Sequence, residues 1–130
     1  MSELEISILS PAKNITKQSA ESVTLPSLIG QICILPGHTK MVSELAVGEL
    51  KIGRDSSNRF FISGGYVDVN DDKVVVMAEV IESPEDIDVV RAKKALDRAN
   101  KRLSNPTGDV DLVRAMAALM RAKERLALAR

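Results

Sequence analysis

The chain has 130 residues, of which 45% are hydrophobic and 28% are charged, so it can form one globular domain with an appendage. Its 18 Lys and Arg balance 18 Asp and Glu, and this neutral total argues against a nucleic-acid-binding protein. Aromatic residues make up only 2% of the chain, so we expect an aliphatic core. No signal peptide is visible and no stretch is apolar enough to span a bilayer, so we expect no membrane insertion.

Charge is distributed unevenly along the chain. Residues 1–84 contain 7 Lys and Arg against 11 Asp and Glu, a balance of −4. Residues 85–130 contain 11 Lys and Arg against 7 Asp and Glu, a balance of +4. The two parts can therefore attract each other, and the second part can attract an acidic partner.

The first part of the chain has the patterns of short β-strands separated by turns. Strands are predicted at residues 3–9, 22–26, 31–35, 47–52, 59–69 and 73–81. Gly64-Gly65 predicts a bend or bulge, and Asn70-Asp71-Asp72 predicts a hairpin turn. About seven to ten short strands in this length are typical of a small antiparallel β-sandwich or a flattened barrel.

The single cysteine, Cys33, excludes an internal disulfide bond and fits a reducing compartment. It lies in the apolar run at residues 31–35, which we interpret as a short buried strand. We therefore expect Cys33 to be buried as a small hydrophobic side chain.

A first helix is predicted to begin near Pro84 and to end at the Asn105-Pro106-Thr107-Gly108 sequence. Ser83 is a suitable N-cap, Pro84 fits the first helical position, and Asp86 has capping-box spacing from Ser83. Apolar residues then recur at helical spacing: Ile87, Val90, Ala92, Ala95, Leu96, Ala99 and Leu103.

A second helix is predicted at residues 109–129, and its apolar face is rich in alanine. A loop of about five residues joins the helices, so we expect an antiparallel hairpin. The predicted fold is α+β: an antiparallel β-sandwich at residues 1–83 followed by a two-helix hairpin at residues 84–130. Alanine seams bury little apolar area, so the hairpin should be weakly held and able to change position.

The motifs indicate no enzyme. The GxxxxGK[ST], GxGxxG, CxxC and HExxH motifs for phosphate and metal sites are absent from the sequence. His38 follows a Pro-Gly turn without a supported nucleophile nearby, and Asp68, Asp71 and Asp72 are expected to solvate a turn. We therefore expect a non-catalytic chain that requires no metal and no cofactor.

The basic residues of the two helices leave two interpretations open. Arg91 and Arg98 lie near one side of the first helix, and Arg121 and Arg125 are one turn apart on the second. In an antiparallel hairpin they could converge into an anion site that holds phosphate oxygens by bidentate hydrogen bonds. The alternative is a solvated basic face.

Three segments together resemble the epsilon subunit of bacterial and chloroplast F-type ATP synthase. The first is LPSLIGQICILPGHTKMVSEL, with its loop, strand and PGH sequence. The second is FFISGGYVDVNDDKVVVMAE, which resembles the strand pair of that family, and the third is IDVVRAKKALDRANKRL. In this order and spacing the segments cover nearly the whole chain.

The resemblance implies a non-catalytic rotor subunit, peripheral at the cytoplasmic face of a bacterial inner membrane or the stromal side of a thylakoid membrane. Its sandwich would bind the gamma subunit and rest on the c-ring, coupling proton flow to ATP synthesis. The resemblance places Gln31 toward the ring, where an acidic residue is common in the family. It places four residues toward gamma: His38, Thr39, Met41 and Ser43.

For the hairpin, the resemblance implies regulation of ATP hydrolysis. An extended hairpin would reach the alpha/beta catalytic head and contact acidic segments of beta through Arg121, Lys123 and Arg125. A folded hairpin would bind ATP as a regulatory ligand. The residues that match this ATP-binding pattern, which includes an I/L-D-x-x-R-A motif, are Glu82, Ile87, Asp88, Arg91, Ala92, Arg98, Arg121 and Arg125.

Two other functions fit the sequence. The chain could be a stand-alone ATP-sensing adaptor, or a plain β-sandwich adaptor with a coiled-coil tail. Co-purification with gamma separates the rotor subunit from both, and nucleotide binding separates the two adaptors from each other.

Overall fold

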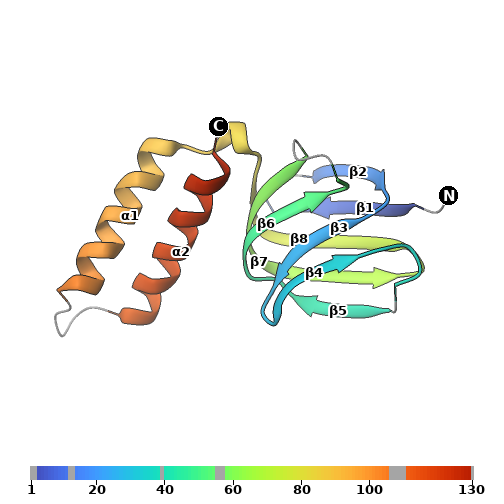
Figure 1. The fold of residues 1–130 in the computed structure, drawn as a ribbon, viewed down its shortest axis with the longest axis horizontal. Coiled ribbons are helices and arrows are strands. Elements are labelled where there is room, and N and C mark those ends of the chain that lie inside the picture. Colours follow the sequence, from blue (N-terminus) through green and yellow to red (C-terminus); the bar gives the residue numbers. More distant parts are fainter. Residues whose placement is uncertain (1–2, 12–13, 39, 55–57, 106–110, 130) are drawn as a thin grey trace. The chain divides into compact units, whose positions relative to one another are not determined.

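The computed structural model describes residues 3–11, 14–38, 40–54, 58–105 and 111–129. The chain divides into two compact units, Met1–Glu82 and Ser83–Arg130. The first is a β-sandwich and the second is a pair of helices, as the sequence predicts (Figure 1).

Eight strands form the sandwich in the described part of the first unit. They are β1 (Leu4–Leu9), β2 (Asn14–Ala20), β3 (Val23–Ser27), β4 (Gly30–Ile34), β5 (Met41–Glu44), β6 (Val47–Ile52), β7 (Arg59–Asn70) and β8 (Lys73–Glu82). Their order is β2-β1-β8-β7-β6-β3-β4, and β5 pairs with β7. β1 and β8 are parallel, whereas the other strand pairs are antiparallel.

The core between the layers is aliphatic, as the shortage of aromatic residues predicts. Alternate residues of β1 point inward, so Leu4, Ile6 and Ile8 are buried while Glu5 and Leu9 are exposed. The same alternation in the other strands completes the cluster, whose largest fully buried members include Val23, Leu25, Ile34, Leu50, Ile52, Ile62, Val67 and Val69.

β7 links the two layers by changing direction at two glycines. Its first half pairs with β6 and its second half pairs with β5. Gly64 and Gly65 have φ values of 75° and 110°, which are unfavourable for other residues. The pairing with β8 keeps one register across them, so the strand bends without an inserted residue. Within the core cluster, the inward position then passes from Ile62 to Val67, an odd step that uninterrupted alternation would not allow, whereas Phe61 is buried outside that cluster.

The predicted hairpin turn between β7 and β8 is confirmed. Asn70 pairs with Lys73, and the two residues between them, Asp71 and Asp72, have φ values of 50° and 61°. Two consecutive positive φ values in a two-residue loop define a type I′ turn, whose twist matches the flanking strands.

Two strands were not predicted. β2 contains NITKQSA, in which polar residues outnumber apolar ones, so it lacks the alternation of a half-buried strand. β5 has only four residues, MVSE, too few for a periodic pattern. Both are recognisable only through their partners, because β2 pairs with β1 and β5 pairs with β7.

The prediction for Cys33 was wrong. β4 is at one end of the strand order and pairs only with β3 within the described sheet, and its sole buried residue is Ile34. Cys33 is one position away from Ile34, so alternation directs its side chain outward, and it is exposed. The run at residues 31–35 is therefore an edge strand rather than a buried one.

The first helix begins later than predicted. Residues Pro84–Asp86 form one 3₁₀ turn, Ile87 is extended, and α1 runs from Val89 to Ser104. Ser83 does not cap a backbone amide; its hydroxyl donates to a carboxylate oxygen of Asp86 at 2.7 Å. Asp88 is the N-cap of α1, because its carboxylate accepts from the Arg91 amide at 3.0 Å.

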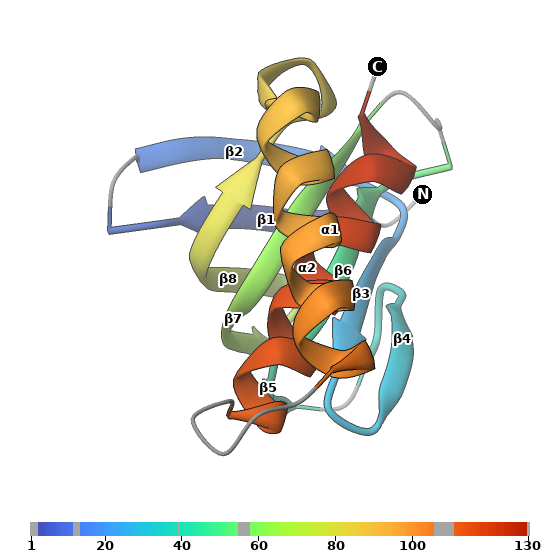
Figure 2. The ribbon, with the colours of Figure 1, turned by 90° about the vertical axis from the view of Figure 1, so that its left-hand side faces the viewer.

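The second helix, α2, runs from Leu112 to Leu128, and the carboxylate of its N-cap, Asp111, accepts from the Arg114 amide at 3.1 Å. The predicted start at Asp109 and most of the predicted loop lie outside the described residues. α1 and α2 lie side by side and run in opposite directions (Figures 1 and 2). Each contributes two buried alanines at a spacing of seven: Ala92 and Ala99, and Ala115 and Ala122.

We expect Gly65→Ala to lower the free energy of unfolding of the chain by about 3 kcal/mol or more. A Cβ atom at this position would overlap the backbone carbonyl oxygen of Met77, in addition to the strain of the positive φ. Gly30→Ala is a matched control, because Gly30 has a φ of 120° but open space around the added Cβ. Urea denaturation measures both, and equal losses would contradict the importance of the close approach at Gly65.

Candidate functional site

An apolar patch lies on the outer face of the sheet, and it includes a residue of β5, the strand that holds the predicted contact residues Met41 and Ser43. The strand register aligns Leu9 of β1 with Met77 of β8, and Met77 with Tyr66 of β7. All three point away from the core and are between 42% and 52% exposed. In the next row, Val42 of β5 and Val75 of β8 flank Asp68. We call Leu9, Val42, Tyr66, Val75 and Met77 the outer-face patch.

A shallow groove runs over part of this patch. It has a volume of about 340 Å³ and is lined mainly by Leu9, Ser10, Pro11, Gly65, Tyr66, Met77, Ala78 and Glu79. Gly65 lines the groove with backbone atoms alone. Contiguous exposed apolar surface of this kind marks a protein contact more often than a site for a small polar ligand.

The structure changes which residues of β5 can make such a contact. Met41 and Ser43 were predicted, but alternation turns both toward the inside and they are half-buried. Val42, between them, is 70% exposed and was missed. Pairing with β7 would have identified Val42, because Asp68 opposite it is also exposed. His38 is half-buried just before β5, and Thr39 lies outside the described residues.

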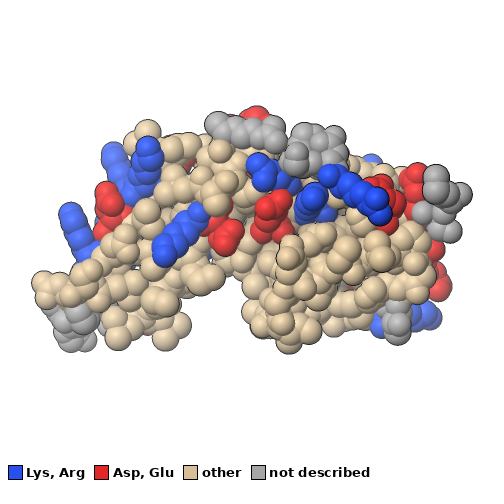
Figure 3. Space-filling view, in the orientation of Figure 1, with Lys and Arg blue, Asp and Glu red and all other residues tan. Residues whose placement is uncertain are grey.

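The turn between β3 and β4 presents a second apolar feature. Leu28 and Ile29 are exposed there, Ile29 to 89%. The Ser27 hydroxyl donates to the Gly30 carbonyl oxygen at 2.6 Å and accepts from the Ile29 amide at 3.3 Å, so the turn has a fixed shape. Gln31, predicted to face a partner, follows this turn and is exposed. Figure 3 shows a broad uncharged area over β3, β4 and β5 on the visible face.

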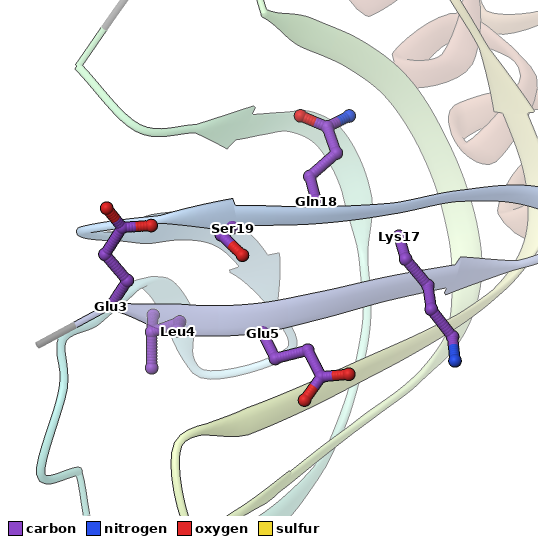
Figure 4. A pocket seen from close by; sticks show the side chains of 6 residues that line it. All are labelled: Glu3, Leu4, Glu5, Lys17, Gln18 and Ser19. Atoms are coloured by element: carbon purple, nitrogen blue, oxygen red, sulfur yellow. The ribbon is translucent and has the colours of Figure 1, made fainter.

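A polar pocket of about 290 Å³ lies at the pair β1 and β2. Figure 4 shows Glu5 and Lys17 extending to one side of this strand pair and Gln18 to the other. The pocket carries charges of both signs and none of the predicted site residues, so it offers no clear preference for a charged ligand.

On the hairpin, arginines accompany the buried alanines in a repeated pattern. Each buried alanine of the helix pair is preceded by an arginine, in the dipeptides Arg91-Ala92, Arg98-Ala99, Arg114-Ala115 and Arg121-Ala122. A residue that precedes a buried alanine lies about 100° to one side of it on the helix. Because the helices are antiparallel, this offset directs the arginines of both helices to the same face of the hairpin.

We call this surface the arginine face, formed by Arg91, Arg98, Arg102, Arg114, Arg121 and Arg125. Arg102 and Arg125 join it because each lies one turn after an arginine of the pattern. Arg91 and Arg98 are exposed, and Arg121 and Arg125 are half-buried. Within the described part of the chain, no ion pair joins Arg91, Arg98 or Arg121 to a carboxylate. Arg98 donates from Nε to the Lys94 carbonyl oxygen at 3.5 Å.

The remaining predicted residues of the hairpin have different environments. Ile87 and Ala92 are buried, so they can shape a site but cannot bind a charge. Asp88 is exposed and holds the Arg91 amide. Lys123 follows Ala122, whereas Arg121 precedes it, so Lys123 projects from the other side of α2. Glu82 ends β8 in the sandwich unit.

Neither a metal site nor a membrane-spanning helix is found among the residues that the structure describes. No group of three or more His, Cys, Asp and Glu side chains there is arranged to hold a metal ion. None of the described helices is both long and apolar enough to cross a membrane.

Comparison with known proteins identifies the protein family to which the chain belongs. The family model for the ATP synthase delta/epsilon chain, beta-sandwich domain, matches residues 3–84, and the model for its long alpha-helix domain matches residues 85–130. The chain therefore belongs to the ATP synthase delta/epsilon chain family, and the predicted resemblance is confirmed.

Curated relatives place the chain among the epsilon subunits of ATP synthase. The ATP synthase epsilon chain of Desulforudis audaxviator is 41% identical over 101 residues, which cover 77% of this chain and 74% of the relative. The ATP synthase epsilon chain of Nitratidesulfovibrio vulgaris is 40% identical over 102 residues, which cover 78% of this chain and 76% of the relative. The relatives are named as a chain of a larger complex.

Solved structures share the fold at lower identity. A chain in the Euglena gracilis mitochondrial ATP synthase superimposes with a TM-score of 0.81 at 24% identity, covering 96% of this chain and 80% of its own. A chain in the Tetrahymena thermophila mitochondrial ATP synthase gives a TM-score of 0.60 at 18% identity, and the match covers 98% of this chain and 93% of that one.

We expect Asp88→Ala to destabilise α1 by about 1 kcal/mol, because it removes the side-chain acceptor at the N-cap. Asp88→Asn should retain most of the stability, since an amide oxygen can accept the same hydrogen bond. Asp97→Ala removes the same charge from the exposed middle of α1 and serves as control. Amide hydrogen exchange in the first turn measures the effect, and equal exchange in the two alanine variants would contradict the capping role.

Proposed function

We propose that the chain is the epsilon subunit of the ATP synthase central stalk, where its sandwich binds gamma and the c-ring and its hairpin regulates ATP hydrolysis. The observation that carries this proposal is the family match across both units of the chain. The fold neighbours come from assemblies described as F1 with c-ring and as central stalk with c-ring, which is consistent with it. Such a subunit transmits rotation and has no catalytic role of its own.

The outer-face patch is the surface that best suits gamma. It is apolar except for Asp68, which lies between Val42 and Val75, and the exposed Glu44 pairs with Tyr66 at its border, a pattern that favours a protein partner. Val42 is its most exposed member and belongs to β5, the strand that follows His38. The segment predicted to face gamma and the patch are therefore continuous.

The turn between β3 and β4 is the feature that best suits the c-ring. A short turn with a fixed hydrogen-bonded shape can present Leu28 and Ile29 to a partner without large loss of conformational entropy. The neighbouring Gln31 can donate and accept hydrogen bonds with the polar loops of a ring. This contact leaves the chain peripheral to the membrane.

The arginine face supports a nucleotide as the ligand of the folded hairpin. Nucleotide phosphates carry several negative charges, and guanidinium groups bind phosphate oxygens in pairs. Asp88 beside Arg91 supplies a carboxylate that can accept from a ribose hydroxyl or an adenine amino group. ATP that binds only the folded hairpin would favour that state and so relieve inhibition, by its differential affinity for the two states.

In an extended hairpin, the same basic residues would bind a second partner, the beta subunit. Residues 85–130 carry a balance of +4, which suits acidic segments of beta in the catalytic head. Because Arg121 and Lys123 project from different sides of α2, one flat acidic surface cannot bind both. We therefore assign the beta contact to Arg121 and Arg125 and leave Lys123 to a neighbouring segment of the head.

We expect Val42→Asp to weaken the binding of the full chain to purified gamma at least tenfold, because it would bury an unpaired carboxylate. Ile29→Asp makes the same chemical change outside the patch and should leave gamma binding unchanged. Surface plasmon resonance with immobilised gamma measures both. If the two variants bind gamma like the wild type, the patch is not the gamma contact; if the wild type does not bind, the stalk proposal fails.

We expect ATP to bind the isolated chain, and Arg98→Ala to weaken that binding about tenfold or more through loss of a charge-assisted hydrogen bond. Lys123→Ala removes an equal charge from outside the arginine face and should change the affinity less than twofold. Isothermal titration calorimetry with ATP and ADP provides the measurement. No heat with millimolar ATP would refute the nucleotide site and would leave the stalk proposal standing.

A further inference from the structure

A tight turn precedes the segment that we assign to the gamma contact. The His38 amide donates to the Leu35 carbonyl oxygen at 3.1 Å, and Gly37 has a φ of 83°. Proline at the second position and a glycine with positive φ at the third are the marks of a type II turn. The turn itself provides no acceptor for the Gly37 amide.

Asp72 provides that acceptor from a distant part of the sequence. Its Oδ1 atom accepts from the Gly37 amide at 2.7 Å, across 35 positions of the chain. The backbone carbonyl oxygen of Asp72 also accepts from the Glu5 amide at 2.8 Å. One residue of the β7–β8 turn is thus bonded both to β1 and to the connection between β4 and β5.

The turn that carries Asp72 is itself well anchored. It closes the longest strand pair of the sandwich, in which Asn70 pairs with Lys73. Asp71 shares the left-handed backbone conformation of Asp72, but its side chain makes no hydrogen bond within the described residues. The two aspartates therefore differ in the contact to Gly37 and not in the turn that they form.

We propose that Asp72 is a positioning residue for partner binding, whose carboxylate holds the Leu35–His38 turn in the conformation that presents His38 and β5 to gamma. This inference rests on the gamma contact proposed above. The turn leads directly into β5, which carries Val42. A segment that is fixed before binding loses less conformational entropy when its partner docks, so the hydrogen bond increases affinity without touching gamma.

Three variants of the full chain separate positioning from the stability of the turn. Asp72→Gly removes the acceptor, but glycine adopts the positive φ without strain, so the β7–β8 turn is preserved. Asp72→Asn keeps an acceptor oxygen and tolerates the left-handed conformation. Asp71→Gly makes the matched change at the position that does not contact Gly37.

Binding to immobilised gamma should be about three- to tenfold weaker for Asp72→Gly, and within about twofold of wild type for the other two variants. Thermal unfolding should give the same midpoint for Asp72→Gly and Asp71→Gly. If these two variants bind gamma equally, or if the loss of affinity follows a lower melting temperature, the positioning role is overturned.

A second readout does not depend on gamma. By NMR, exchange of the Gly37 amide hydrogen with solvent should be faster in Asp72→Gly than in Asp71→Gly and Asp72→Asn. Unchanged exchange would overturn the inference whether or not gamma binds. A different outcome is that exchange at Gly37 is faster in Asp72→Gly, as expected, but the wild-type chain does not bind gamma. This outcome would refute the proposed gamma contact, and with it the role of the turn in presenting that contact.

Discussion

The sandwich depends on the change of direction in β7. This strand pairs with β6 before Gly64-Gly65 and with β5 after it, so one continuous strand connects the two layers. Positive φ values at both glycines, and the approach of the Met77 carbonyl to Gly65, leave no room for a side chain at the crossing.

The arginine face of the hairpin arises in a different way, from a repeated pair of residues. Alanine at every seventh position packs the helices, and the arginine before each alanine follows the same spacing on the flank. In a parallel pair this offset would direct the two sets of arginines to opposite faces. The antiparallel arrangement brings them to one face, so the packing pattern and the charge pattern cannot be separated.

Much of this could be predicted from sequence, and the errors have physical causes. Strong local signals were sufficient for β6, for the Asn70–Lys73 turn and for the two helices. Cys33 was misjudged and Val42 was missed because the composition of a short segment does not reveal which face a strand turns to the core; only its pairing does. The helix start was misplaced because Ser83 and Asp88 both offer capping signals, and the hydrogen bond to the Arg91 amide distinguishes them only in three dimensions.

The two units differ in how much free energy holds them in one arrangement, and this difference suits the proposed role of a regulated stalk subunit. The sandwich buries many Val, Leu and Ile side chains, each contributing about 1.5–3 kcal/mol, so it can transmit force as a rigid body. The helix pair is joined largely through alanines, which contribute far less each. A ligand present at 100 times its dissociation constant stabilises the state it binds by about 2.7 kcal/mol. A bound nucleotide on the arginine face would therefore change the balance of a weakly packed hairpin while leaving the sandwich unaffected.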